Sequence, residues 1–356
     1  MALASRSTGE RSRIVELASG IDALYLSAWT QRPEWLIDGL AQAKAEALAK
    51  DAAVPYRLGG EDFELQPRSW RTYPYLLTFE GGRVGVNLNG TIPPFRFQPR
   101  AEWLHGEGAS AVAAWFEDML MVHLMYVVVS VSRIDLFADF EGLSFEQGDL
   151  RRFVGRARSR QLFEEDERWT GFMFGKRKSG TICARIYDKT EQLRVHRAGY
   201  WAEVWGRPIE GPPVTRVEFE LTATALHDFG VRTPKEVLAA AGSLWAWLTS
   251  QWLSLRDPTD DETRSRWEVA DMWHDVQRAR LCEGSVGIER ARAASRRADL
   301  RWHGPRLVGA IASVAALLGT EDLESTLSHL PLLVSGIEFE SGRTFEDRVV
   351  ERKRGA

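Results

Sequence analysis

Three segments of the sequence alternate charged and apolar residues with a period of two, and this pattern constrains the fold more than any other feature. The segments are SRIDLFADF (132–140), TICARIYDK (181–189) and VTRVEFELT (214–222). Successive side chains of a β-strand point to opposite faces of a sheet, so each segment predicts a strand with one apolar face and one charged face. Such alternation is typical of an antiparallel sheet with one face on the core.

The charged faces carry groups that could support catalysis. They comprise Arg133, Asp135 and Asp139 on the first strand, Cys183, Arg185, Tyr187 and Lys189 on the second, and Arg216, Glu218 and Glu220 on the third. A wet sheet face crossed by surface ion pairs is the simplest interpretation of any one strand. Together the three strands also suit phosphoryl transfer, because carboxylates hold Mg²⁺ or Mn²⁺, basic side chains neutralise a phosphodiester, and a tyrosine can act as the nucleophile.

The rest of the chain predicts an α+β protein. Strands are expected at 21–29, 70–79, 83–88, 95–104, 129–140, 169–176, 181–187 and 214–222, with helices at 32–50, 111–126, 236–255, 265–280, 287–301 and 305–318. After Pro234 the spacing of apolar residues becomes that of helices. We therefore expect a flexible tail (1–18), an antiparallel sheet domain with packed helices (19–230) and a mainly helical domain (231–356).

Charge is distributed unevenly along the 356 residues, whose net charge is −4. Residues 151–216 contain 15 Lys and Arg against 8 Asp and Glu, which favours one face built for an anionic partner. A second basic run, with Arg296 and Arg297, is either a solvated helix face or a DNA-contacting helix. The predicted DNA-binding residues are Arg133, Arg156, Arg158, Lys176, Arg177, Lys178 and Arg216. Only two cysteines and no apolar run of membrane length occur, so we expect a cytoplasmic protein.

A resemblance to a known family rests on the ordered motifs of the three strands. SRIDL with Asp139 following, ARIYDK (184–189) and TRVEFEL (215–221) resemble the trans-acting plasmid rolling-circle replication initiators, the Rep_trans family, and the related relaxases of integrative conjugative elements. The resemblance covers residues 130–222 well and 20–225 loosely. It implies an HUH-like, RRM-like sheet in which the usual pair of metal-binding histidines is replaced. The absence of any His-x-His motif agrees with this.

The resemblance also implies a mechanism and a set of site residues. Tyr187 would nick one DNA strand, become joined to the 5′ phosphate and leave a free 3′ hydroxyl. The residues implied to face phosphate or act in catalysis are Arg185, Lys189 and Arg216, and those implied to hold Mg²⁺ or Mn²⁺ are Asp135, Asp139, Glu218 and Glu220. The expected partners are single-stranded or hairpin origin DNA, a host helicase and a second copy of the chain.

Two alternatives to a nicking and joining enzyme stay open. One is a metal-dependent nuclease that uses water, with Tyr187 only structural, and the other is a catalytically silent DNA-binding protein on the same scaffold. A covalent protein–DNA adduct separates the nicking and joining enzyme from both. Tyr200, close to Trp201 and Trp205, is either a second nucleophile or a packing and base-stacking residue.

Overall fold

The computed structural model describes residues 13–90, 92–177, 180–196, 198–282, 300–342 and 344–354. These residues fall into two compact units, one of 13–227 with 231–282 and one of 228–230 with 300–354. The division therefore differs from the predicted boundary at 230/231. The physical reason is apolar burial in a strand beyond that boundary, where Leu253 and Leu255 are at most 1% exposed.

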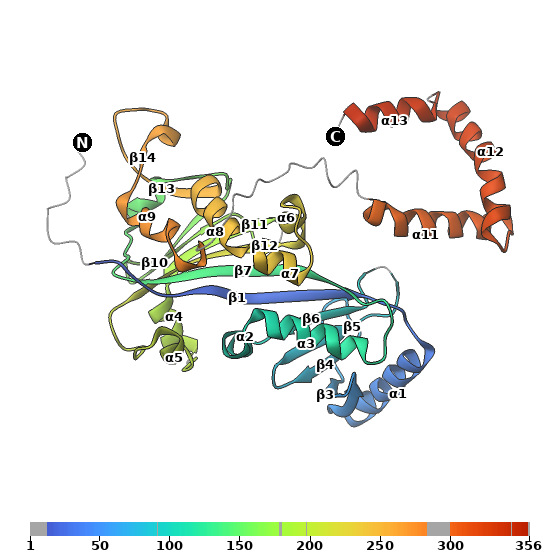
Figure 1. The fold of residues 1–356 in the computed structure, drawn as a ribbon, viewed down its shortest axis with the longest axis horizontal. Helices are drawn as coiled ribbons and strands as arrows, with labels where there is room; N and C mark the ends of the chain where they lie inside the picture. The colour runs from blue at the N-terminus through green and yellow to red at the C-terminus, as the bar shows by residue number, and fades with distance from the viewer. Residues whose placement is uncertain are drawn as a thin grey trace. The chain divides into compact units, whose positions relative to one another are not determined.

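One antiparallel sheet dominates the first unit (Figure 1). Its strands are β1 (Val15–Trp29), β2 (Val54–Leu58), β3 (Glu61–Gln66), β4 (Tyr75–Phe79), β5 (Gly82–Val86), β6 (Phe95–Pro99), β7 (Val128–Glu141), β9 (Arg160–Glu165), β10 (Arg168–Phe174), β11 (Ile182–Asp188) and β12 (Val214–Thr222), in the spatial order β2-β3-β4-β5-β6-β1-β7-β12-β11-β10-β9. A smaller sheet holds β8 (Phe153–Gly155), β13 (Leu253–Asp257) and β14 (Glu268–Val269).

The two longest strands, β1 and β7, lie side by side in the middle of the large sheet (Figure 1). They pair from Val15↔Glu141 to Trp29↔Val128, with three register shifts along β1. On its other side β1 pairs with β6, and β7 pairs with β12. The central pair therefore joins an N-terminal half-sheet to the half-sheet that carries the three alternating segments.

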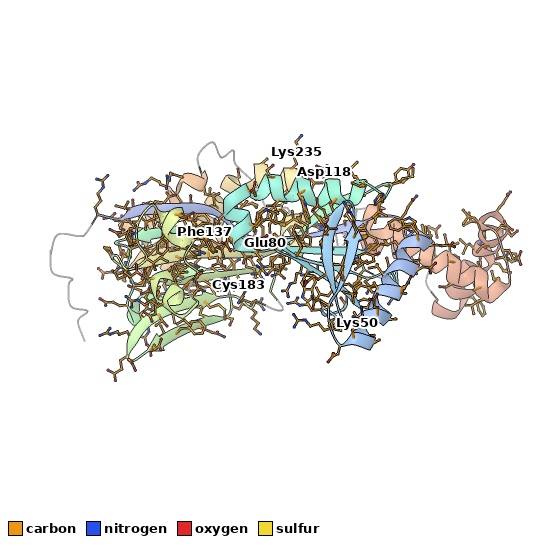
Figure 2. The ribbon with its side chains drawn as sticks, turned by 90° about the horizontal axis from the view of Figure 1, so that it is seen from below. Lys50, Glu80, Asp118, Phe137, Cys183 and Lys235 are labelled. Carbon is orange, nitrogen blue, oxygen red and sulfur yellow. The ribbon has the colours of Figure 1, made fainter. Side chains whose placement is uncertain are left out.

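Helices pack on both faces of the large sheet. Those of the first unit are α1 (Glu34–Lys50), α2 (Ala101–Glu107), α3 (Ala109–Met121), α4 (Lys189–His196), α5 (Trp201–Trp205), α6 (Ala223–Asp228), α7 (Pro234–Ala239), α8 (Ala241–Trp247) and α9 (Asp271–Gln277), with short turns at Gln147–Arg151, Leu248–Trp252, Arg264–Arg266 and Arg280–Cys282. On one side, α3 with Asp118 and α7 with Lys235 run along the same edge of the view in Figure 2.

Aromatic contacts show which face each helix covers. The ring of Phe97 stacks on Phe116 of α3 at 4.9 Å, and the ring of Phe219 meets Trp245 of α8 edge-on at 5.4 Å. Helix α5 covers the opposite face of the second half-sheet, where Trp201 lies 5.6 Å from Phe137. Both faces of β12 are thus covered, and eight of its nine residues are buried.

The α+β class, the large antiparallel sheet and the helical C-terminal region confirm the sequence prediction. The strand at 214–222 has the predicted bounds. Other predictions were wrong in part. The strand expected at 95–104 ends at Pro99, after which α2 begins. The helix expected at 236–255 breaks at Ala240 and ends at Trp252 with the π-helical turn Leu248–Trp252. Segment 253–257 forms a strand because its backbone pairs with that of β8, with Leu255 opposite Phe153.

Three helices make up most of the second unit: α11 (Leu300–Leu318), α12 (Leu323–Ser341) and α13 (Phe345–Arg354). Asp322 caps α12 by accepting a hydrogen bond from the Ser325 amide at 2.8 Å. In the part of the chain that the structure describes, no helix has the length and apolarity needed to cross a membrane. Most of the helix expected at 287–301, with Arg296 and Arg297, lies outside the described residues, as does most of the flexible tail.

Candidate active site

Strand register places the charged residues of the three segments in cross-strand rows. The rows, read across β11, β12 and β7, are Tyr187–Arg216–Asp139, Arg185–Glu218–Phe137 and Cys183–Glu220–Asp135. All of these side chains share one sheet face, as the alternation predicts. The face is not wet, however, because α4 and α5 cover one end of it. Asp135, Glu218 and Glu220 are each at most 5% exposed.

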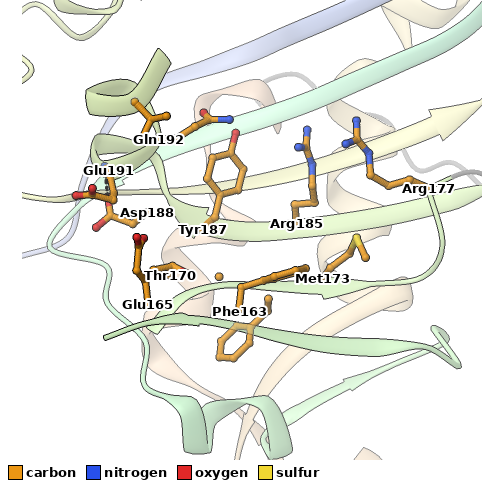
Figure 3. Close-up of a pocket in the computed structure, with 13 residues that line it drawn as sticks. Phe163, Glu165, Thr170, Met173, Arg177, Arg185, Tyr187, Asp188, Glu191 and Gln192 are labelled. Atoms are coloured by element: carbon orange, nitrogen blue, oxygen red, sulfur yellow. Dashed lines mark hydrogen bonds between the residues drawn. The ribbon is translucent and has the colours of Figure 1, made fainter. Parts of the chain in front are cut away.

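Tyr187 lies at the edge of this face, beside an open pocket of about 460 Å³. Its hydroxyl donates a hydrogen bond to Glu218 Oε2 at 3.0 Å, and the Arg185 guanidinium binds the other oxygen of the same carboxylate. Figure 3 shows Tyr187, Arg185 and Arg177 projecting to the same side of the pocket. Gly171 faces Tyr187 across the β10–β11 pair, and a Cβ there would come within 3.1 Å of the tyrosine Cβ.

The Tyr187 hydroxyl holds its proton firmly. Burial raises the pKa of this phenol well above its usual value of 10.0, and the negative charge of Glu218 raises it further. Arg216 and Arg185 act in the opposite direction. At neutral pH the hydroxyl is therefore protonated, and a nucleophilic oxygen forms only if a neighbouring group takes the proton. The Glu218 carboxylate is the group that accepts the hydrogen bond of this hydroxyl.

The other two carboxylates of the site are paired with arginines. Arg133 donates two hydrogen bonds to Asp135, one of them at 2.7 Å, and its Nη2 lies 2.9 Å from Glu220. Arg177 Nε lies 3.2 Å from the same Glu220 oxygen. Burial raises the pKa of Asp135 to about 7. Repulsion from Glu218 and Glu220 also raises this pKa, whereas Arg133 lowers it. The carboxylates thus form a crowded cluster held by guanidinium groups.

This raised pKa makes stability depend on pH through Asp135. The folded state holds the Asp135 proton up to about pH 7, whereas the unfolded chain loses it near 3.8. Between these values the folded state binds more protons, so the free energy of unfolding falls as pH rises. We expect the melting temperature of Asp135→Asn, relative to that of the parent, to be higher at pH 8 than at pH 5. A constant difference, measured by thermal unfolding at both pH values, would contradict the raised pKa.

Arg216 and Asp139 form a buried pair, which corrects their predicted roles. Both are 0% exposed, and Arg216 donates two hydrogen bonds of 2.7 Å to the Asp139 carboxylate. Asp139 also accepts one from Trp205 Nε1 at 2.8 Å, and Arg216 Nη1 lies 2.9 Å from Asp22. The guanidinium lies 4.2 Å from the ring centres of both Phe137 and Trp201. Arg216 therefore does not face a phosphate, and Asp139 is not free to bind a metal ion.

Asp22 joins this pair, although its own side chain is 21% exposed. Arg216 and a hydrogen bond with His105 hold the pKa of its carboxyl well below the usual range, although burial alone would raise it. His105 Nε2 lies 3.4 Å from Asp22 Oδ1. Tyr200 stacks over this group, 5.4 Å from the Trp201 ring and 5.9 Å from His105. Its surroundings are those of a packing residue, and burial raises its pKa to about 12.

The carboxylates do not form a metal site as they are arranged. Among the described residues, no group of three or more His, Cys, Asp and Glu side chains is placed to hold a metal ion. The reason is visible in the contacts, because Asp135, Glu218 and Glu220 are each engaged by an arginine. The arginine guanidinium groups supply the positive charge that a metal ion would otherwise supply to these carboxylates.

Lys189 is buried rather than exposed to a phosphate. It is 5% exposed, and its Nζ donates to Gln192 Oε1 at 2.8 Å and lies 4.7 Å from the Trp201 ring centre. Burial and repulsion from Arg216 lower its pKa to about 8. Gln192 lines the pocket near Tyr187 (Figure 3), so Lys189 reaches the site through this amide.

The remaining predicted DNA-binding residues are spread over the molecule. Arg156 and Arg158 are exposed, but Arg156 stacks over Trp247 at 5.2 Å and donates to the Gln251 carbonyl. These contacts place it beside α8, which packs on the face of β12 opposite Glu218. Lys176 is exposed, Arg177 lies at the pocket, and Lys178 falls outside the described residues.

Comparisons with known proteins give a likeness to solved structures and no other match. No protein-family model matches the chain, and no curated protein matches it significantly. Among solved structures, it is similar to a rolling circle replication initiator protein from Geobacillus stearothermophilus, with 16% identity and a TM-score of 0.43. The alignment covers 73% of this chain and 96% of that protein.

Proposed function

We propose that the protein nicks and rejoins a DNA strand by transesterification through Tyr187, as a replication initiator or relaxase would. The observation that carries the proposal is the hydrogen bond from the Tyr187 hydroxyl to Glu218, beside an open pocket that Arg177 and Arg185 also line. A tyrosine that only stabilises the fold has no need of a buried carboxylate as its partner, because an unionised phenol is satisfied by any neutral acceptor.

The proposed reaction uses the groups of the pocket in order. Glu218 accepts the Tyr187 proton as the phenol oxygen attacks phosphorus. The new bond joins the tyrosine to the 5′ phosphate, and the bond from phosphorus to the 3′ oxygen breaks, with a proton from water completing the 3′ hydroxyl. Arg185 and Arg177 neutralise the charge that gathers on the phosphoryl oxygens. Rejoining is the reverse reaction, with the 3′ hydroxyl as nucleophile.

Mg²⁺ or Mn²⁺ at Asp135, Glu218 and Glu220 stays a proposal derived from the family resemblance. Bound there, a divalent cation would neutralise charge on the phosphate. Binding requires Arg133, Arg177 and Arg185 to release these carboxylates, so we assign the cation no part in the reaction steps above.

The decisive experiment is incubation with circular single-stranded DNA, followed by a denaturing gel. One arm contains Mn²⁺ and the other contains EDTA. A covalent adduct that withstands denaturation supports tyrosine transesterification. Cleavage in Mn²⁺ without an adduct would select a nuclease that uses water, and binding without cleavage would select a catalytically silent DNA-binding protein. An adduct in the EDTA arm would show that the arginines suffice.

Glu218→Gln tests the proton acceptor. Glutamine keeps the shape and can still accept the tyrosine hydrogen bond, but it cannot take the proton. We expect adduct formation to slow by about 10² to 10⁴-fold at neutral pH, which is the usual range for loss of a general base. The rate should then rise with pH, because hydroxide removes the proton instead. Single-turnover rates across pH measure this, and an unchanged rate at pH 7 would exclude Glu218 as the base.

A further inference from the structure

Four arginines outside the predicted site gather on the N-terminal half-sheet, and we call them the arginine patch: Arg68, Arg71, Arg83 and Arg96. Arg83 lies on β5 and Arg96 on β6, while the other two lie in the loop between β3 and β4. Trp70 and Tyr73 close this loop through a pair of backbone hydrogen bonds of 2.9 and 3.0 Å. Arg71, within the turn, has a φ of 55°.

The patch shares a sheet face with the candidate active site. Arg83 pairs with Gln98 across β5 and β6, and its guanidinium donates to the Gln98 side chain. Gln98 in turn donates to the Tyr25 hydroxyl on β1 at 2.8 Å. Tyr25 is opposite Arg133 on β7, which holds Asp135 and Glu220. A continuous polar row therefore runs from Arg83 across the centre of the sheet to the site.

The charges of the patch are uncompensated. Burial lowers the pKa of Arg83, and Arg71 and Arg68 lower it further, while Arg96 is affected in the same way by Arg71 and Arg133. Within the described part of the chain, no ion pair involves any of the four, unlike Arg57, which pairs with Asp62. Arg96 Nε is buried without a hydrogen-bond partner among the described residues. Like charges held together this way favour an anion.

Aromatic rings hold the two strand arginines in place. The Arg83 guanidinium lies 4.4 Å from the Trp70 ring centre, and that of Arg96 lies 5.6 Å from the same ring. Trp70 and Tyr73 reach this position because Gly85 has no side chain: a Cβ there would come within 2.8 Å of Tyr73 and 2.9 Å of Trp70. Stacked guanidinium groups lose little conformational freedom when they bind a phosphate.

We propose that the arginine patch binds the sugar-phosphate backbone of single-stranded DNA, along the polar row that leads to Tyr187. The inference rests on the proposed function in one respect, since the bound strand is the one that Tyr187 cuts. The row from β11 to β5 crosses five strand spacings, or about 24 Å. Cations stand at both ends of this row, Arg83 on β5 and Arg185 on β11, and an extended anionic chain can reach both. Compact phosphate ligands would occupy one arginine pair and leave the rest unused.

The test removes two exposed cations without disturbing the sheet. The variant is Arg68→Gln with Arg71→Asn, because asparagine tolerates the positive φ at residue 71. The matched control is Lys50→Gln with Arg57→Gln, which removes two exposed cations that already have acidic partners. The probe is a fluorescein-labelled oligothymidylate long enough to cross the row, titrated by fluorescence anisotropy between about 50 and 200 mM salt. A duplex of the same length is titrated alongside.

We expect the patch variant to bind the single strand about tenfold more weakly, with a salt slope shallower by about 1.4, as for the loss of two phosphate contacts. The control should bind like the parent. Equal affinity and slope for parent and patch variant would overturn the inference. An equal loss of affinity for the duplex would overturn its single-strand part.

The failure of the inference is distinguishable from that of the proposed function. Adduct formation on saturating DNA should persist in the patch variant, because Tyr187, Glu218 and Arg185 are unchanged. Patch-dependent binding without any adduct from the parent would refute the nicking chemistry and leave the patch supported. An adduct with patch-independent binding would refute the patch alone.

Discussion

Tyr187→Phe should reduce the covalent protein–DNA adduct to background while leaving the protein folded and able to bind DNA. The substitution keeps the ring and removes the hydroxyl, which is the atom proposed to bond to phosphorus. One hydrogen bond to the Glu218 carboxylate is lost, at a cost of about 1.5 to 3 kcal/mol. The measurement is a denaturing gel of the adduct, with anisotropy to follow DNA binding and thermal unfolding to confirm the fold.

Tyr200→Phe is the matched control, because Tyr200 is the only other tyrosine that the sequence suggested as a nucleophile. Its ring packs on Trp201, so the variant should keep both the fold and the adduct. A full adduct yield from Tyr187→Phe, with loss in Tyr200→Phe, would move the nucleophile to Tyr200. Retention in both would move the reaction away from either residue.

Arg216→Met should cause a large loss of stability, larger than that of Tyr187→Phe. Methionine fills the space between Phe137 and Trp201 but leaves the Asp139 carboxylate buried without its charge partner. Removing one member of a buried ion pair costs about 3 to 5 kcal/mol. For a domain of this size that lowers the melting temperature by roughly 10 °C. Thermal unfolding at neutral pH measures the effect.

The control is Arg177→Gln, which removes an arginine that is 44% exposed. Its partner Glu220 keeps Arg133, so the expected loss is within about 1 kcal/mol. A loss of similar size in both variants would show that the Arg216 pair has no special structural role. Adding Asp139→Asn to Arg216→Met should recover part of the stability, because the uncompensated charge disappears.

The sequence predicted which residues share a face, but not how they divide between structure and chemistry. Alternation alone places Arg216 and Glu218 on one side of β12, and the register confirms it. It cannot show that Arg216 contacts Asp22 and Trp201, since these come from β1 and α5. Burial of a charged side chain depends on contacts between distant segments, which leave no local periodic signal.

The N-terminal half-sheet was predicted only in part for a related reason. The hairpin around Glu80 and Gly81 was recognised from its turn residues. Strands β2 and β3 were missed because they span only five and six residues and β2 contains Pro55, although Asp62–Leu65 alternates polar and apolar side chains. The arginine patch was also missed, because its four members are dispersed along residues 68–96, which carry no basic run. Only the pairing of β5 with β6 and the closing of the loop bring them together.

The long central pair of strands has a consequence for how the first unit opens. Strand β1 pairs with β6 along one edge and with β7 along the other, and β7 pairs with β12 along its second edge. Neither half-sheet can come apart without exposing the backbone of this pair. Amide hydrogens in β1 and β7 should therefore exchange with solvent only through global unfolding, and more slowly than those of β2 and β9 at the two sheet edges. The arginine patch and Tyr187 would then belong to one cooperative unit of the sheet. A DNA strand bound at the patch would therefore meet Tyr187 in a fixed position.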